Sequence, residues 1–233
     1  MGEKGRWPRL LVWIRAEGWV ECVLMSTSAI KLAVLASGGG TTLQNFIDRI
    51  AAGELDAQVK VVIASRPGIM AIHRAANAQI MSFVVDRKRY SCVEAFSQEV
   101  FRLCDDAGVE LVCLAGWLCL LALPAQYRGR AMNIHPALLP SFGGKEMYGH
   151  RVHQAVLDHG CRISGCTVHF VDEQYDNGPI IVQRTCPVMD DDTPQTLAHR
   201  VFEEEKLAYP EAIRLFHQNR LKVDGRRVHI LPA

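Results

Sequence analysis

The chain has 233 residues, of which 49% are hydrophobic and 22% charged, values typical of a globular protein with a substantial core. Its formal net charge is +1, and no basic run indicates a nucleic-acid partner. None of its eight cysteines forms a C-x-x-C pair, and no stretch has the length of a membrane span. We therefore expect a cytoplasmic protein with reduced thiols.

The first thirty residues differ from the rest of the chain. They contain three of the four tryptophans but no clear periodic element, and the apolar run 10–14 is too short for the core of a signal peptide. We predict an N-terminal extension over residues 1–29, either disordered or, with a start at Met25, not translated. One domain is expected over residues 30–233.

Short apolar runs and helically spaced apolar residues then alternate along the chain. The predicted strands are 31–36, 59–64, 82–85, 110–115 and 131–134. The predicted helices are 41–51, 69–78, 90–106 and a short one near 121–129. This alternation predicts an α/β fold, namely a single-domain, Rossmann-like open sheet that is mostly parallel, with helices on both faces.

The pattern changes after residue 160. Two segments rich in β-forming residues, 164–171 and 179–188, are expected to extend the sheet. A long helix is predicted over 193–216, with Asp191, Asp192 or Thr193 as its cap. The chain ends in a predicted hairpin that turns at Asp224-Gly225.

Asn133 and His135 are the most informative pair of residues. They alternate across Ile134, so in a strand their side chains point to the same face. Pro136 cannot donate to a strand ladder and ends the strand. An amide and an imidazole therefore stand together at a strand's carboxyl end, which is where open α/β sheets bind ligands.

Asp176 stands in the run Asp-Asn-Gly-Pro, whose residues all favour turns. The run is either a plain turn or the source of a carboxylate partner for His135, which would orient the imidazole and raise its protonated fraction. His150 and His153 form an H-x-x-H pair that fits a helix face better than a metal site.

The glycine-rich segment 37–42, Ser-Gly-Gly-Gly-Thr-Thr, joins the first strand of the regular region to the helix that follows. Such a loop is either a tight turn or an anion site at a helix N-terminus. Leu43 departs from the dinucleotide fingerprint, and the lysine of a P-loop is missing. If the loop binds an anion, a phosphomonoester fits better than NAD or ATP.

These three motifs together resemble the phosphoribosylglycinamide formyltransferase family over about residues 31–217. The resemblance implies a formyltransferase domain over 30–233 that transfers the formyl group of 10-formyltetrahydrofolate to the amine of glycinamide ribonucleotide, in purine synthesis. It implies a folate co-substrate, no metal, and no covalent intermediate.

The resemblance also assigns roles to individual residues. Catalysis would use Asn133, His135 and Asp176. The ribonucleotide would contact Gly39, Gly40, Thr41, Thr42 and Glu205. The folate would contact Trp117, Leu118, Cys119, Leu120, Leu121, Val171 and Glu173. Two positions depart from the family pattern, since Thr42 replaces a common asparagine and Cys119 a common arginine.

Two alternatives stay open. A formyltetrahydrofolate hydrolase would use the same residues with water as the nucleophile, and a non-catalytic protein would only bind folate or a nucleotide. The expected partners are small-molecule substrates, with no nucleic acid or membrane, in a monomer or homodimer. The loop 143–149 is either a lid, with Lys145 near the phosphate, or a plain surface loop.

Overall fold

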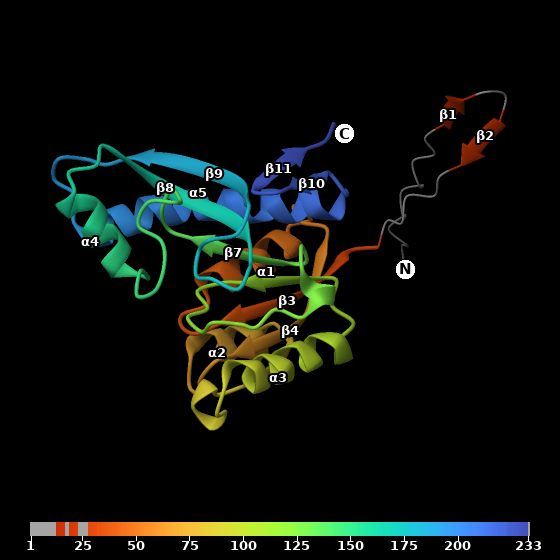
Figure 1. Ribbon diagram of the computed structural model, residues 1–233, viewed down its shortest axis with the longest axis horizontal. Helices are drawn as coiled ribbons and strands as arrows, with labels where there is room; N and C mark the ends of the chain where they lie inside the picture. Colours follow the sequence, from red (N-terminus) through yellow and green to blue (C-terminus); the bar gives the residue numbers. More distant parts are fainter. Residues whose placement is uncertain (1–12, 17–18, 23–27, 233) are drawn as a thin grey trace, which may run out of the picture.

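A computed structural model describes residues 13–16, 19–22 and 28–232. Its centre is a seven-stranded sheet in the order β5-β4-β3-β6-β7-β8-β9 (Figure 1). The strands are β3 (Ile30–Ala36), β4 (Ala57–Ala64), β5 (Met81–Val84), β6 (Leu111–Leu114), β7 (Ala131–His135), β8 (Ile163–Phe170) and β9 (Ile180–Pro187). The first five pair in parallel, and β8 and β9 are antiparallel. The predicted α/β fold with a mostly parallel sheet is confirmed.

The helices and the short strands outside the sheet complete the described chain. The helices are α1 (Thr41–Ala51), α2 (Met70–Asn77), α3 (Val93–Asp106), α4 (His150–Asp158) and α5 (Pro194–His217), with 3-10 turns η1 (Arg87–Arg89) and η2 (Ala125–Tyr127). Two antiparallel pairs are formed by β1 (Trp13–Ala16) with β2 (Trp19–Cys22) and by β10 (Leu221–Asp224) with β11 (Arg227–Ile230). Most of the predicted extension 1–29 lies outside the described residues, and its separate status stays a prediction.

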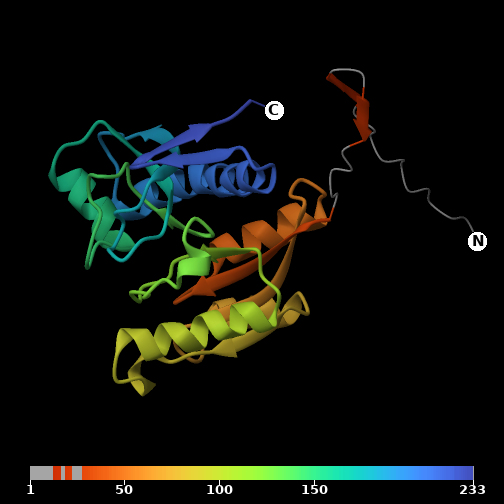
Figure 2. The ribbon, with the colours of Figure 1, turned by 45° about the vertical axis from the view of Figure 1, so that its right-hand side comes forward.

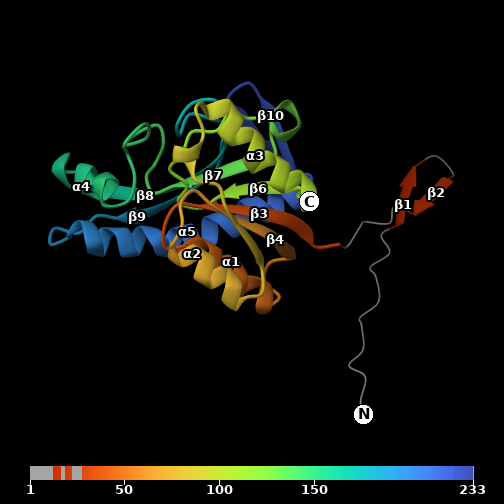
Figure 3. The ribbon, with the colours of Figure 1, turned by 90° about the horizontal axis from the view of Figure 1, so that it is seen from below.

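The sheet separates two apolar layers, as Figure 3 shows with α3 above the strands and α1, α2 and α5 below. Strand β3 illustrates the division, because successive side chains of a strand point to opposite faces. Leu32 and Val34 pack with residues of α1, α2 and α5, whereas Ala33 and Leu35 pack with residues of α3. Both faces of the central strands β3 and β6 are buried, which explains why these parallel strands are nearly continuous apolar runs.

Three local predictions are wrong in detail. The helix expected near 121–129 is only the short turn η2, because Pro124 disfavours helical geometry in the residue before it. The helix expected from residue 90 begins at Val93, after Cys92 accepts a capping hydrogen bond. The C-terminal hairpin turns at Gly225 and Arg226, since Asp224 pairs with Arg227.

Helix α5 continues through an internal proline, Pro210. Thr193 caps the helix, and its hydroxyl and Thr196 form a reciprocal capping box. Pro210 has no N–H for the Lys206 carbonyl one turn earlier. The side chain of Asn45 on α1 donates to that carbonyl instead, at 3.2 Å. This hydrogen bond replaces the one that Pro210 cannot form, and it holds α5 against α1 close to Glu205.

Tyr209 links α5 to the centre of the sheet. Its ring is fully buried and meets Phe46 of α1 edge-on, with centroids 5.1 Å apart. Its hydroxyl lies 2.8 Å from the Met132 carbonyl and 3.1 Å from the Leu114 carbonyl. The helix is thereby anchored to the adjacent central strands β6 and β7.

Seven cysteines between residues 28 and 232 are free thiols. Four of them are buried, which agrees with the expectation of reduced cysteines inside the apolar runs. Within the described part of the chain, no helix is both long and apolar enough to cross a bilayer.

Candidate active site

The order of the sheet places a pocket at its carboxyl edge. After β3 the chain moves outward to β4 and β5, then returns to β6 on the other side of β3. Ligands bind at such a switch point in open α/β sheets. A pocket of about 790 Å³ opens there. Its wall includes the glycine loop, the ends of β6 and β7, the loop 144–149, and one face of α5.

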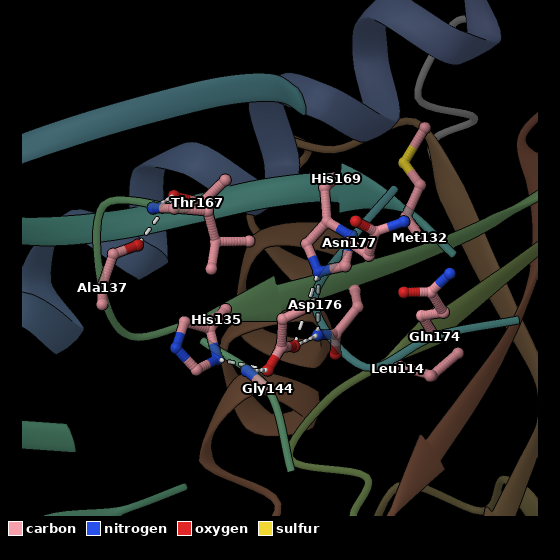
Figure 4. Close-up of polar contacts among 12 residues, drawn as sticks. Leu114, Met132, His135, Ala137, Gly144, Thr167, His169, Gln174, Asp176 and Asn177 are labelled. Atoms are coloured by element: carbon pink, nitrogen blue, oxygen red, sulfur yellow. Dashed lines mark hydrogen bonds and ion pairs between the residues drawn. The ribbon is translucent and has the colours of Figure 1, made fainter. Parts of the chain in front are cut away.

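Asn133, His135 and Asp176 all line this pocket, and Figure 4 shows His135 beside Asp176. Asn133 donates through Nδ2 to Oδ1 of Asp176 at 3.2 Å. Nδ1 of His135 lies 3.3 Å from Oδ2 of the same carboxylate. The two residues of β7 therefore share a face, as their spacing predicts, and Asp176 contacts both.

The carboxylate of Asp176 is held from several sides. Its backbone is left-handed, with φ of 51°, which is tolerated by aspartate more readily than by most side chains. The Gly144 amide donates to Oδ2 at 2.9 Å. Burial acts to raise the pKa of this carboxyl, but contacts with His169, His135 and Gly144 outweigh it, and the pKa lies below its ordinary value.

His135 is only 3% exposed. Its Nε2 faces the Phe142 carbonyl at 2.8 Å, so Nε2 carries a proton and donates. Burial lowers the pKa of the imidazole below its ordinary value, although Asp176 acts in the opposite direction. Asp176 thus raises the pKa of the ring, in the expected direction, but desolvation of the charged ring is larger and the net shift is downward.

His169 completes the group, and the sequence motifs did not identify it. It lies opposite Asn133 in the antiparallel pairing of β7 with β8. Its Nδ1 lies 2.8 Å from the Phe170 carbonyl and donates to it. Its Nε2 lies 3.2 Å from Nδ2 of Asn133. A lone histidine within the apolar run 163–170 is the signal that could have found it.

Thr167 fixes the chain that follows His135. Its hydroxyl is completely buried, donates to the Ala137 carbonyl at 2.7 Å and accepts from the Leu139 amide at 3.0 Å. Gln183 of β9 donates to the same hydroxyl at 3.0 Å. The segment after β7 is therefore tied to two strands of the sheet, and Figure 4 shows its contact with Thr167 of β8.

The glycine loop forms another wall of the pocket. Gly40 is the N-cap of α1 with φ of 69°, and no side chain caps the helix, so its first backbone amides are free to bind an anion. A Cβ at Gly40 would lie 2.8 Å from the Cα of Ala71. Only glycine fits both the backbone angle and this close approach. Thr41 and Thr42 also line the pocket.

Arginine side chains support the glycine loop from outside. Nε of Arg66 donates to the Ser37 carbonyl at 2.9 Å, and Nε of Arg74 donates to the Gly39 carbonyl at 2.9 Å. The Ser37 hydroxyl accepts from Ser65 at 2.7 Å and from the Leu118 amide at 3.0 Å. These bonds couple the glycine loop to the end of β6.

Glu205 on α5 reaches the same pocket. Burial raises the pKa of its carboxyl to about 7. At neutral pH this group therefore exchanges readily between acid and carboxylate, and it can accept or donate a hydrogen bond to a ligand.

The residues expected to bind folate are divided by the structure. Trp117 and Leu118 line the pocket. The other five are absent from its wall. Leu121 is buried in the apolar layer around α3, and Cys119 and Val171 pack against that layer. Leu120 is partly buried, and Glu173 is exposed and paired with Arg128. The pocket wall instead includes Tyr175, Phe202 and His199.

His150 and His153 lie on α4, as their spacing predicts. His153 lines the pocket, is 4% exposed, and its Nδ1 has no hydrogen-bond partner. Burial lowers its pKa to about 4, so the ring is neutral at pH 7. Among the residues that the structure describes, no three histidine, cysteine, aspartate or glutamate side chains form a group that could hold a metal ion.

Comparison with known proteins gives a consistent result. A family model described as formyl transferase matches residues 30–213. The trifunctional purine biosynthetic protein adenosine-3 of Gallus gallus is 38% identical over 201 residues, which cover 85% of this chain and 20% of that protein. The chloroplastic phosphoribosylglycinamide formyltransferase of Arabidopsis thaliana is 37% identical over 195 residues, covering 82% of this chain and 67% of that protein.

A solved structure is similar over nearly its whole length. Glycinamide ribonucleotide transformylase 1 from Symbiobacterium toebii superposes with a TM-score of 0.83 at 38% identity, covering 93% of this chain and 99% of that one. The chain spans about a fifth of the length of the trifunctional Gallus gallus relative. Because the family model matches most of the chain, the chain belongs to the formyl transferase family.

Proposed function

We propose that this chain transfers the formyl group of 10-formyltetrahydrofolate to the amine of glycinamide ribonucleotide, a step of purine synthesis. The observation that carries the proposal is the convergence of Asn133, His135 and Asp176 on one pocket that also contains an uncapped helix N-terminus. The names of the similar proteins support the same substrates.

The two ends of the pocket suit the two substrates. The ribonucleotide phosphate would bind the amides of Gly39, Gly40 and Thr41 with the hydroxyl of Thr42, because these groups surround the positive end of α1. Glu205 would contact the glycinamide portion. The folate would bind beside Trp117 and Leu118, which line the pocket. Folate contacts from five residues outside the pocket wall rest on the family resemblance alone: Cys119, Leu120, Leu121, Val171 and Glu173.

The reaction itself needs a nucleophile, an oxyanion site and a proton path. The amine lone pair attacks the formyl carbon and forms a C–N bond, while the carbonyl electrons move to oxygen. Asn133 and His135 would donate hydrogen bonds to that oxyanion, each worth roughly 10²–10³ in rate. The C–N bond to the folate then breaks, and its nitrogen receives the proton that the amine loses. Asp176 assists this transfer.

The described contacts show what substrate binding must change. Nδ2 of Asn133 is engaged with Asp176 and His169, and Nε2 of His135 with the Phe142 carbonyl. An oxyanion must therefore replace at least one of these acceptors. Phe142 begins the loop that lines the pocket through Gly144 and Lys145, so movement of this loop would free Nε2.

The test is a turnover assay with 10-formyltetrahydrofolate, with and without glycinamide ribonucleotide. We expect turnover that requires the ribonucleotide. The turnover rate should fall at least about 10²-fold in His135→Ala. It should be normal in His217→Ala, a control at the last residue of α5, where the ring lies near Asp56. Turnover without the ribonucleotide would identify a hydrolase instead. Folate binding without turnover under either condition would leave only a binding role.

A further inference from the structure

The C-terminal hairpin reaches the loop that carries Asp176. Arg226 stands in the two-residue turn between β10 and β11. Its Nη2 donates to the Asn177 carbonyl at 2.8 Å, and its Nη1 lies 3.4 Å from Oδ1 of the same residue. Both contacts fall on the residue that directly follows Asp176.

The hairpin is a firm base for such a contact. Leu221 and Val228 pack against the core layer that contains α5. Its open end is closed by Arg220, which accepts from the Leu231 amide at 2.8 Å and donates through Nε to the Leu231 carbonyl at 2.7 Å. Figures 1 and 2 show the hairpin beside α5, with β11 next to the start of β9.

The Asp176 loop needs support at its tip. Its downstream end is fixed against β8. The Pro179 carbonyl accepts from the Phe170 amide at 2.9 Å, and Gly178 packs so closely on the Phe170 carbonyl that a Cβ would overlap it. Between these ends, Asn177 also donates to Asp172 within the loop, at 2.7 Å. Arg226 thus supplies a contact from outside the loop next to the left-handed Asp176.

We propose that Arg226 is a positioning residue that holds the Asp176 loop through Asn177 and so places the carboxylate against His135 and Asn133. The inference rests on the proposed function, but the hairpin lies beyond residues 30–213, the span that the family model matches. Arg226 does not line the pocket. Its effect therefore reaches the reaction only through the geometry of Asp176.

Position matters here because Asp176 contacts three groups at once. Its oxygens lie 3.3 Å from Nδ1 of His135, 3.2 Å from Nδ2 of Asn133 and 2.9 Å from the Gly144 amide. A shift of the loop changes all three contacts together. Displacements of about 1 Å in a catalytic group cost up to roughly 10²-fold in rate.

The experiment compares three variants of the full chain. Arg226→Ala removes both contacts, Arg226→Lys keeps the charge and one reachable donor, and Arg227→Ala removes an equal charge from an exposed neighbour in the same hairpin. Hydrogen–deuterium exchange of residues 172–178 reports the loop without any substrate. Formyl transfer to glycinamide ribonucleotide reports kcat and KM.

We expect Arg226→Ala to exchange faster in residues 172–178 and to lose kcat roughly 3- to 10-fold, with KM for both substrates within about twofold. Arg226→Lys should recover part of both losses, and Arg227→Ala should match wild type. An Arg226→Ala protein with wild-type exchange and kcat overturns the proposal, as does an equal loss in Arg227→Ala. A wild-type chain without transfer activity refutes the proposed function instead, and the exchange data still decide whether Arg226 holds the loop.

Discussion

Asp176→Asn is the sharpest test of the site, because it changes charge with almost no change in shape. The side chain is 10% exposed and contacts His135, Asn133 and the Gly144 amide. An asparagine in its place keeps one acceptor and introduces an N–H₂ group. That group would face either the Asn133 amide nitrogen or the Gly144 amide, both of which are donors.

The expected losses follow from these contacts. Removing a carboxylate that supports proton transfer lowers kcat by roughly 10²–10⁴-fold, and about 10³-fold corresponds to about 4 kcal/mol in the barrier. KM should change little, since Asp176 acts on His135 and Asn133 and no substrate contact is assigned to it. Loss of charge-assisted hydrogen bonds should lower the free energy of unfolding by about 1–3 kcal/mol at pH 7.

The stability loss has a defined pH dependence. The folded-state pKa of Asp176 lies below its ordinary value of 3.8. A depressed carboxyl pKa stabilises the folded state above the unfolded value, and this stabilisation disappears as the pH falls through the folded value. Wild type and Asp176→Asn should therefore differ most in urea unfolding at neutral pH and converge under acid conditions.

Asp192→Asn is the matched control. Asp192 is likewise buried, with 2% of its side chain exposed, and its oxygens pair with Arg200 at 2.6 Å. It does not line the pocket, so its amide variant should lose stability and keep kcat. If Asp176→Asn kept kcat within about tenfold of wild type, or if both variants lost kcat equally, the role assigned to Asp176 would be wrong.

Three further predictions concern single side chains. Glu205→Gln should gain stability over wild type as the pH rises from 4.5 to about 7, because burial raises the carboxyl pKa and the folded wild type resists ionisation in that window; urea unfolding at pH 5 and pH 8 measures this. In Gly178→Ala the free energy of unfolding should fall by about 2–3 kcal/mol, since the added Cβ overlaps the Phe170 carbonyl. In Gly38→Ala the added Cβ has no atom within 4 Å, so this variant should unfold like wild type. Tyr209→Phe should lose about 1–3 kcal/mol in the same assay, because its buried hydroxyl contacts two strand carbonyls.

The sequence predicted the sheet well because both of its faces are buried. All four residues of β6 and the last four residues of β4 are apolar and buried, so these runs stand out between amphipathic helices. The helix prediction near 121–129 failed because apolar residues there are buried without forming a helix. The apolar residues before Pro124 suggested a helix, but their burial is satisfied by extended chain packed on α3.

The site was predictable only as far as its residues are neighbours in sequence. The two-residue spacing of Asn133 and His135 places them on one face of β7, and both side chains contact Asp176. His169 became visible only with the register of β8 against β7, and Gly144 only with the path of its loop. Such contacts join segments more than 30 residues apart, and no periodicity encodes them.

Burial and Asp176 shift the pKa of His135 in opposite directions, and this opposition explains why Asp176 should affect kcat and not substrate binding. Burial keeps the imidazole mostly neutral at pH 7, with its proton on Nε2 facing the Phe142 carbonyl at 2.8 Å. Nδ1 then faces Asp176 at 3.3 Å without a proton, a longer contact than that of Nε2. A proton that reaches Nδ1 during the reaction creates an imidazolium whose two nitrogens already face oxygen acceptors. The carboxylate stabilises that charged form more than the neutral ring, so most of its contribution to the rate arises after proton uptake.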